Sequence, residues 1–229
     1  MLARLEDNLG ETELASRHRR IADKIYKKTE EVFWDDEKKM FADDREHTFF
    51  IEHTQCIATL SDHAQDKVKD MMKALADPQP PVHIYRTTIY YSFYLFEACK
   101  KAGCFEVFDE KINFWSDLTK QGFKTTPECP EPARSDCHAW GAHPLYHLQT
   151  GILGVSPYSP CFKTVQIKPN LLNLDKVEGC VPHKLGDIKV SLFKENDIIK
   201  GTVILPEGLT GIFFNNQEVI PLFSGENEL

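Results

Sequence analysis

The pattern of apolar residues changes near residue 160, and this change constrains the fold more than any other feature of the sequence. Before it, apolar residues recur at three- and four-residue steps, as in the stripe that contains Leu14, Ile21 and Ile25. From Phe162 onward, short runs of alternating polar and apolar residues are separated by turn residues, which is typical of strands. The order predicts a chain of helices followed by a β-domain.

Six segments before residue 154 are predicted to be helical: 11–34, 49–60, 62–75, 84–103, 105–121 and 136–153. Asp62 is placed to cap the third of them. The fourth ends in two lysines and Gly103, a pattern that suits the last turn and the end of a helix. Six helices in sequence make about three consecutive α-hairpins.

Four later runs are predicted to be strands: 165–169, 187–193, 198–206 and 211–222. Residues 195–196 and 214–216 have the composition of hairpin turns. Lys189 and Lys194 stand between apolar residues, which suits a sheet with one solvated face. These features predict a β-domain of about 70 residues that begins near residue 160.

The net charge excludes some classes of partner. The chain carries a formal charge of −8, whereas nucleic acids and anionic membranes require clustered Lys and Arg. No apolar run approaches the roughly 20 residues that span a bilayer, and the charged start MLARLEDNLGETEL does not resemble a signal peptide. Seven cysteines, an odd number without a CxxC pair, favour a reducing compartment such as the cytoplasm.

The loop after residue 121 carries two candidate catalytic carboxylates, Glu128 and Glu131. Prolines at 127, 130 and 132 stiffen it, because each proline fixes φ and restricts the residue before it. Glycosidic cleavage needs two carboxylates on opposite sides of the scissile bond. Two glutamates three residues apart on one loop lie on the same side, so one of them would be the base and the acid would lie elsewhere. Ordinary solvated carboxylates are the alternative.

Three histidines follow the loop. His143 and His147 have the i,i+4 spacing of some zinc sites, but no glutamate stands between them as in HExxH. Packing, or a hydrogen bond to a polar ligand, is the preferred interpretation, so no metal or cofactor is expected. A Cys137–His138 nucleophile pair is disfavoured, since adjacent helical side chains point about 100° apart.

His138 differs from the other two histidines because it stands where the loop meets the helix, two residues after Asp136. A helix N-terminus offers free N–H groups and favours negative charge. Trp140 follows, and its ring suits either the core or an apolar platform for a sugar.

The residues PEPARSDCHAWGAHPLYHLQTGILG (130–154) resemble the signature near the end of the catalytic barrel of bacterial α-L-rhamnosidases, which are inverting glycoside hydrolases. TTPE (125–128) is similar to the motif that precedes this signature in the family. The later runs FKTVQIKPNLLNL, GCVPHKLGDIKVSL and GTVILPEGLTG resemble the family's C-terminal β-sandwich. The likeness extends over essentially the whole chain.

This resemblance implies the C-terminal half of an (α/α)6 barrel in residues 1–158 and an antiparallel β-sandwich in residues 159–229. It implies that Glu128 is the general base, which activates the attacking water. It further implies three substrate-binding residues, Asp136, His138 and Trp140. Glu131 matches a variable position of the family, and Thr126 stands where the family often has an aromatic residue.

The family's general acid matches no carboxylate of residues 1–121, and the resemblance implies that it lies in a portion preceding Met1. We therefore expect a partner, either that N-terminal portion or a second copy, because half a barrel leaves apolar helix faces uncovered. Two functions remain open: hydrolysis of terminal α-L-rhamnosides in glycosides or polysaccharides with this chain on the base side, or a non-catalytic carbohydrate-binding or assembly fragment.

Overall fold

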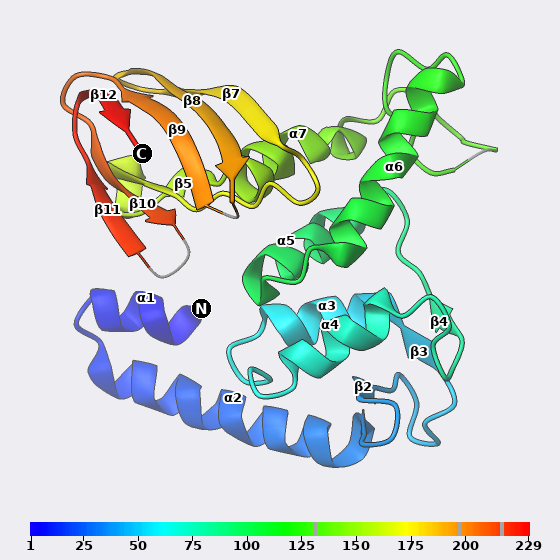
Figure 1. Ribbon diagram of the computed structural model, residues 1–229. Coiled ribbons are helices and arrows are strands. Elements are labelled where there is room, and N and C mark those ends of the chain that lie inside the picture. Colours follow the sequence, from blue (N-terminus) through cyan, green and yellow to red (C-terminus); the bar gives the residue numbers. More distant parts are fainter. Residues whose placement is uncertain (131, 197, 216–217) are drawn as a thin grey trace. The chain divides into compact units, whose positions relative to one another are not determined.

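The computed structural model describes residues 1–130, 132–196, 198–215 and 218–229, and it places helices first and strands later, as predicted (Figure 1). The helices are α1 (Leu2–Asn8), α2 (Thr12–Phe33), α3 (Glu52–Leu60), α4 (Val68–Ala76), α5 (Ser92–Ala102), α6 (Glu106–Lys120) and α7 (Pro144–His147). Short strands between the helices are β1 (Trp34–Asp35), β2 (Met40–Phe41), β3 (Phe50–Ile51) and β4 (Ile84–Tyr85). The later strands are β5 (Val155–Pro157), β6 (Thr164–Ile167), β7 (Lys176–His183), β8 (Gly186–Glu195), β9 (Ile198–Leu205), β10 (Thr210–Asn215), β11 (Glu218–Leu222) and β12 (Gly225–Glu228).

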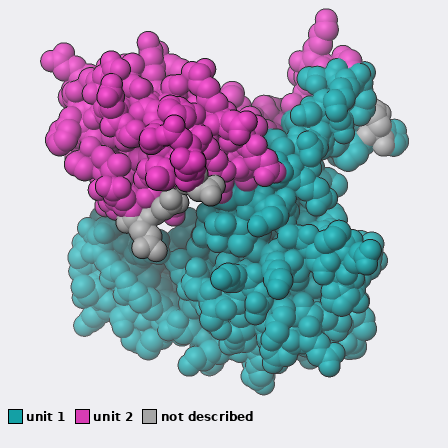
Figure 2. Space-filling view, in the orientation of Figure 1, with its two compact units in different colours: residues 1–121, 128–135 teal, residues 122–127, 136–229 magenta. Residues whose placement is uncertain are grey.

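The chain forms two compact units, coloured separately in Figure 2. Unit 1 contains residues 1–121 and 128–135, and unit 2 contains residues 122–127 and 136–229. Unit 1 therefore holds α1 to α6, and unit 2 holds α7 and the two large sheets. The proposed domain boundary between residues 158 and 159 stays a prediction.

The core of unit 1 lies between α3, α4, α5 and α6. Helix α4 shows how the sequence builds it, since the residues spaced at i, i+3, i+4 and i+7 are all buried, as predicted: Val68, Met71, Met72 and Leu75. Phe96 of α5 and Phe108 of α6 pack with ring centroids 4.4 Å apart. Burying side chains of this size stabilises the fold by roughly 1.5–3 kcal/mol each.

The fourth predicted helix is only half helical. Residues 84–85 form strand β4, which pairs in parallel with β3, and α5 begins only at Ser92. The backbone N–H of Thr87 is bonded to the carboxylate of Glu52, so it is not available to a helix. The predicted end of this helix is confirmed, because Lys100 and Lys101 lie in the last turn of α5 and Gly103, with φ +68, caps the helix after Ala102.

Two other predictions about helices are wrong. Asp62 does not cap a helix: α4 starts at Val68, and the Asp62 carboxylate instead lies 3.0 Å from Arg4 and 3.5 Å from Lys101. The segment 136–153 is not one α-helix, because a 3-10 turn over Ala139–Ala142, the short α7 and a π-helical turn over Leu148–Ile152 follow one another. Pro144 separates the first two pieces, since proline cannot continue a hydrogen-bonded helix.

Helix α2 matches its predicted length, but its apolar stripe does not face a core. Leu14, Ile21 and Ile25 are 42, 44 and 62% exposed, and Ala15 is the helix's fully buried residue. This agrees with the expectation of uncovered apolar helix faces.

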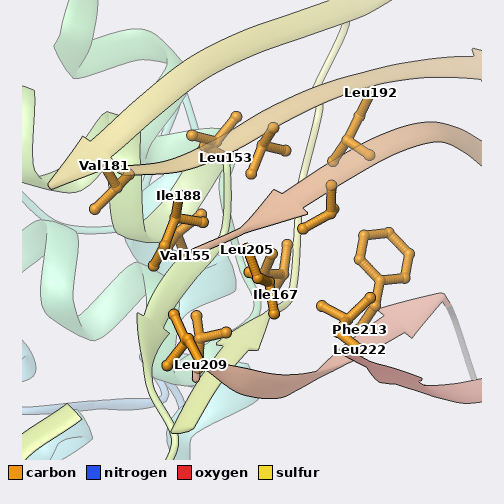
Figure 3. Packing of buried hydrophobic residues seen from close by; sticks show 13 residues of the cluster. Leu153, Val155, Ile167, Val181, Ile188, Leu192, Leu205, Leu209, Phe213 and Leu222 are labelled. Carbon is orange, nitrogen blue, oxygen red and sulfur yellow. The ribbon is translucent and has the colours of Figure 1, made fainter. Parts of the chain in front are cut away.

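Unit 2 is built on two four-stranded sheets with the orders β11-β10-β6-β5 and β12-β9-β8-β7. Their inward side chains form one hydrophobic core, part of which is labelled in Figure 3: Leu153, Val155, Ile167, Val181, Ile188, Leu192, Leu205, Leu209, Phe213 and Leu222. The predicted turn at residues 195–196 joins the antiparallel pair β8–β9. The predicted turn at residues 214–216 falls at the end of β10, which is antiparallel to β11, and its last residue, Asn216, is outside the described residues. The expectation of a purely antiparallel fold is wrong in one place, since β6 and β10 pair in parallel. These two strands are joined through the other sheet, so no tight turn fixes their direction.

Gly201 is required by the close approach of two strands in this unit. Its φ is +140, and a Cβ atom built there would overlap the carbonyl oxygen of Ser191 on β8. Gly225 also has a positive φ of +92, but a Cβ atom built there would meet no other part of the chain within 4 Å.

No helix within the described part of the chain is long and apolar enough to cross a membrane.

Candidate functional site

The loop between α6 and the 3-10 turn is closed at its base by hydrogen bonds that involve Thr126 and His138. The backbone N–H of His138 donates to the Thr126 carbonyl at 2.7 Å, and the Thr126 hydroxyl donates to the His138 carbonyl at 2.7 Å. The Thr125 hydroxyl also donates to the Asp136 carbonyl. Thr126 therefore fixes the backbone of His138, a role that an aromatic side chain at this position does not have.

Glu128 lies in the part of the loop that belongs to unit 1. Its backbone N–H donates to the carbonyl of Ser135 at 2.9 Å, and its side chain is only 12% exposed. The Arg134 guanidinium, which is 81% exposed, contacts the Oε1 atom of Glu128. The carboxylate is thus held in one orientation by a charged hydrogen bond, as a positioned acid or base requires. Glu131 lies outside the described residues.

His138 and Trp140 are brought together in unit 2, with ring centroids 4.4 Å apart and the ring planes tilted by 36°. Trp140 is 41% exposed, so part of its face is open to a ligand. The Nδ1 atom of His138 is buried and has no hydrogen-bond partner among the residues that the structure describes. A buried nitrogen in this state calls for a ligand or a water molecule. Trp140 therefore offers an apolar face, and His138 offers a polar contact.

Asp136 is exposed, and it accepts the hydrogen bond from Thr125 with its backbone carbonyl rather than its side chain. Glu128 belongs to unit 1, whereas Asp136, His138 and Trp140 belong to unit 2. The structure brings together His138 and Trp140, and the substrate-binding roles of these residues stay predictions.

His143 and His147 interact with each other. Their Nδ1 atoms are 3.1 Å apart, the His147 Nδ1 atom also lies 3.0 Å from the His143 carbonyl, and His147 is 1% exposed. Within the described ranges, no group of three or more His, Cys, Asp or Glu side chains is arranged to hold a metal ion. The geometry supports packing of the two histidines rather than a ligand pair.

Two cysteines of unit 1 are poor candidates for a nucleophile. Cys56 and Cys99 are buried, and this burial raises the pKa of both thiols well above the ordinary value. The nucleophile in cysteine chemistry is the thiolate, so a raised pKa makes these side chains inert.

Unit 1 has an apolar groove between α2 and α3, which the sequence did not reveal. The groove has a volume of about 650 Å³, and its lining includes Ile25, Tyr26, Phe33, Phe41, Ile57 and Tyr91. Ile25 and Ile57 are 62 and 56% exposed. Exposed apolar surface of this kind marks a place where something binds.

Of the three comparisons with known proteins, the one with solved structures finds matches. No family model and no curated protein matches the chain. Among solved structures, the chain is similar to a GH78 family rhamnosidase of Bacillus sp. GL1, with 25% identity, a TM-score of 0.74 and coverage of 94% of this chain. It is also similar to the native α-L-rhamnosidase from Aspergillus terreus, with 14% identity, a TM-score of 0.71 and coverage of 100%. The chain spans only 24% and 28% of the lengths of these two proteins. The resemblance to α-L-rhamnosidases that residues 125–154 predict is confirmed.

Proposed function

We propose that this chain, similar over most of its length to α-L-rhamnosidases, supplies the general-base side of an inverting glycosidase that hydrolyses terminal α-L-rhamnosides. In this proposal residues 1–158 are the C-terminal half of an (α/α)6 barrel and residues 159–229 are a β-sandwich. The observation that carries the proposal is the coincidence of the 125–140 motif with structural similarity to a rhamnosidase over 94% of the chain. The little-exposed, oriented carboxylate of Glu128 fits the role.

Glu128 acts as the base. Its Oε2 atom accepts a proton from a water molecule, while the water oxygen attacks the anomeric carbon from the face opposite the leaving group. The bond to the glycosidic oxygen breaks, and a second carboxyl group protonates that oxygen. In inverting enzymes the two carboxyl groups are about 6.5–9.5 Å apart, which leaves room for the water. The partner described below brings the second carboxyl group.

The substrate-binding residues are Asp136, His138 and Trp140. The exposed face of Trp140 takes the apolar face of the sugar ring, and the buried Nδ1 atom of His138 bonds a sugar hydroxyl. Asp136, which is exposed, accepts a hydrogen bond from a second hydroxyl.

The proposed partner, which covers the groove between α2 and α3, is the remaining portion of the enzyme. The alternative partner is a second copy of this chain. The chain spans about a quarter of the length of the Bacillus rhamnosidase, so a protein of that size has further chain to cover the groove between α2 and α3. Covering Ile25 and Ile57 with apolar helix side chains removes exposed hydrophobic surface from water.

The test is hydrolysis of an aryl α-L-rhamnoside by this chain alone and after addition of a polypeptide that corresponds to the rest of the Bacillus enzyme. We expect turnover only in the mixture. Glu128→Gln then lowers turnover by about 10²–10⁴-fold, whereas the matched control Glu46→Gln, an exposed glutamate of the same unit, leaves it unchanged. The first product detected by NMR is the β-anomer, and an α-anomer contradicts inversion.

The second candidate function is non-catalytic carbohydrate binding. The contact of Arg134 with Glu128 favours it, because the guanidinium occupies one carboxylate oxygen as in a structural ion pair. This candidate is supported over the enzyme if the Glu128→Gln variant still binds a rhamnoside and neither the chain alone nor its mixture with the partner polypeptide shows turnover.

A further inference from the structure

A small pocket in unit 1 opens beside the loop that carries Glu128. It has a volume of about 240 Å³ and is lined by residues 87–89, the first residue of α5, the middle of α6 and Pro130, which stands two residues after Glu128. Sites for drug-sized ligands occupy roughly 300–1,000 Å³. The pocket therefore suits one small ring.

A buried carboxylate outside the pocket holds two of the residues that line it. Glu52 is 0% exposed, and its Oε2 atom accepts hydrogen bonds from the backbone N–H of Thr87 at 2.7 Å and from the Thr87 hydroxyl at 2.6 Å. The ammonium of Lys111 lies 3.8 Å from the same oxygen, and Arg86 donates to Oε1 at 3.1 Å. Thr87 and Lys111 both line the pocket, so its polar wall is fixed before any ligand binds.

The charges around the pocket balance. Glu52 pairs with Arg86 and Lys111, and the exposed Glu110 lines the pocket as a second carboxylate, so these four side chains have no net formal charge. A carboxylated ligand would find the Lys111 ammonium already paired with a buried carboxylate. The cluster therefore favours a neutral ligand over an anionic one.

The remaining lining has the two surfaces that recognise a sugar. Phe114 and Trp115 are half-buried aromatic residues with ring centroids 5.2 Å apart, and they offer an apolar wall. Thr88 is exposed and adds a hydroxyl that can both donate and accept a hydrogen bond. A lining that combines aromatic rings with hydroxyl and charged groups suits the apolar and polar faces of a pyranose ring.

We infer that this pocket is a subsite for one neutral pyranose ring, such as the L-rhamnose unit or its neighbour in the substrate, with Thr88, Lys111, Phe114 and Trp115 as the contacting side chains. The inference rests on the proposed function, because it assigns the pocket a ring of the same substrate. Pro130, two residues after Glu128, connects this subsite to the loop that carries the proposed base.

The experiment is an NMR titration of the full chain with L-rhamnose, which follows the indole N–H signal of Trp115, assigned through Trp115→Phe. We expect this signal to shift in a saturable manner. Thr88→Val removes one hydroxyl at almost constant volume and weakens the binding about five- to tenfold. Thr119→Val, at an exposed threonine of α6 outside the pocket, does not change the binding. D-glucuronate binds more weakly than L-rhamnose.

Three results overturn the inference: a Trp115 signal that rhamnose does not shift, equal affinity of the wild type and Thr88→Val, or tighter binding of glucuronate. Phe114→Leu is the second variant if Thr88→Val does not fold, and it is expected to weaken binding as well. Failure of the proposed function looks different. In that case rhamnose still shifts the Trp115 signal and Thr88→Val still weakens binding, but no mixture hydrolyses a rhamnoside and Glu128→Gln changes nothing.

Discussion

Glu52 and Thr87 lie 35 residues apart in the sequence, yet one oxygen of the Glu52 carboxylate accepts both the backbone N–H and the hydroxyl of Thr87. The carboxylate belongs to the first turn of α3, and Thr87 precedes α5. This contact ties the two segments that β3 and β4 also join. It accounts for the late start of α5, because Thr87 cannot enter a helix without giving up both bonds.

Replacement of Glu52 is expected to destabilise unit 1. Glu52→Gln keeps the shape but leaves Arg86 and Lys111 without their counter-charge. Removing one partner of a buried ion pair costs about 3–5 kcal/mol; here about 2–4 kcal/mol is expected, since the Arg86 side chain is 35% exposed. Urea unfolding measures the change. Glu46→Gln is the control, and equal midpoints for the two variants contradict the prediction.

Gly201 is expected to be far less tolerant of alanine than Gly225. Both have positive φ, and backbone strain of this kind costs about 1–3 kcal/mol. Gly201→Ala adds an overlap with the Ser191 carbonyl oxygen, whereas Gly225→Ala meets open space. The free energy of unfolding of unit 2, followed by NMR signals of its core residues, should fall by at least about 2 kcal/mol more for Gly201→Ala.

Five of the seven cysteines are expected to react with a thiol reagent in a fixed order. Cys137 and Cys161 are exposed and should react first. Cys180 is also exposed, but desolvation and the Asp187 carboxylate raise its thiol pKa, which lowers the thiolate fraction. At about pH 8, near the ordinary thiol pKa, Cys180 should lag behind the first two, and the lag should shrink as the pH rises.

Cys56 and Cys99 should be labelled only after unfolding, because both are buried and burial raises their pKa. Mass spectrometry of timed samples identifies the sites. Early labelling of Cys99 in the folded chain is the result that contradicts this order.

The groove between α2 and α3 is expected to bind a hydrophobic dye in the isolated chain. Ile25→Lys places a charge at its edge and should lower the dye fluorescence severalfold. Val219→Lys is the matched control, since Val219 is a 54% exposed β-branched residue of unit 2. Addition of the partner polypeptide should displace the dye from the wild type, and dye that stays bound in the active mixture rules out this surface as the interface.

The parts of the fold that depend on local pattern could be predicted from the sequence. Helix α4 follows from the spacing of its four buried apolar residues, and the end of α5 follows from Gly103. The parts that failed depend on distant partners. The start of α5 depends on the bond between Thr87 and Glu52. The parallel pairing of β6 with β10 depends on the three strands that lie between them in the sequence and belong to the other sheet.

The candidate site, like the fold, could be predicted from the sequence only where a local motif marks it. The motif around Glu128 and His138 could be recognised, but Glu52 could not be assigned a role from one glutamate in the segment FFIEHTQC. A carboxylate within an apolar run is itself a signal, because a buried charge requires a cation from elsewhere. The sequence does not name that cation, since Arg86 and Lys111 are 34 and 59 positions away.

The two compact units alternate along the chain three times, because residues 122–127 belong to one unit and residues 128–135 to the other. No single cut can therefore separate them. A truncation at residue 121 deprives the helical unit of the segment that carries Glu128, and a truncation at residue 135 leaves six residues of the second unit attached to the first. Recombination or protein engineering that exchanges one unit for another must therefore preserve residues 122–135 as a linked whole.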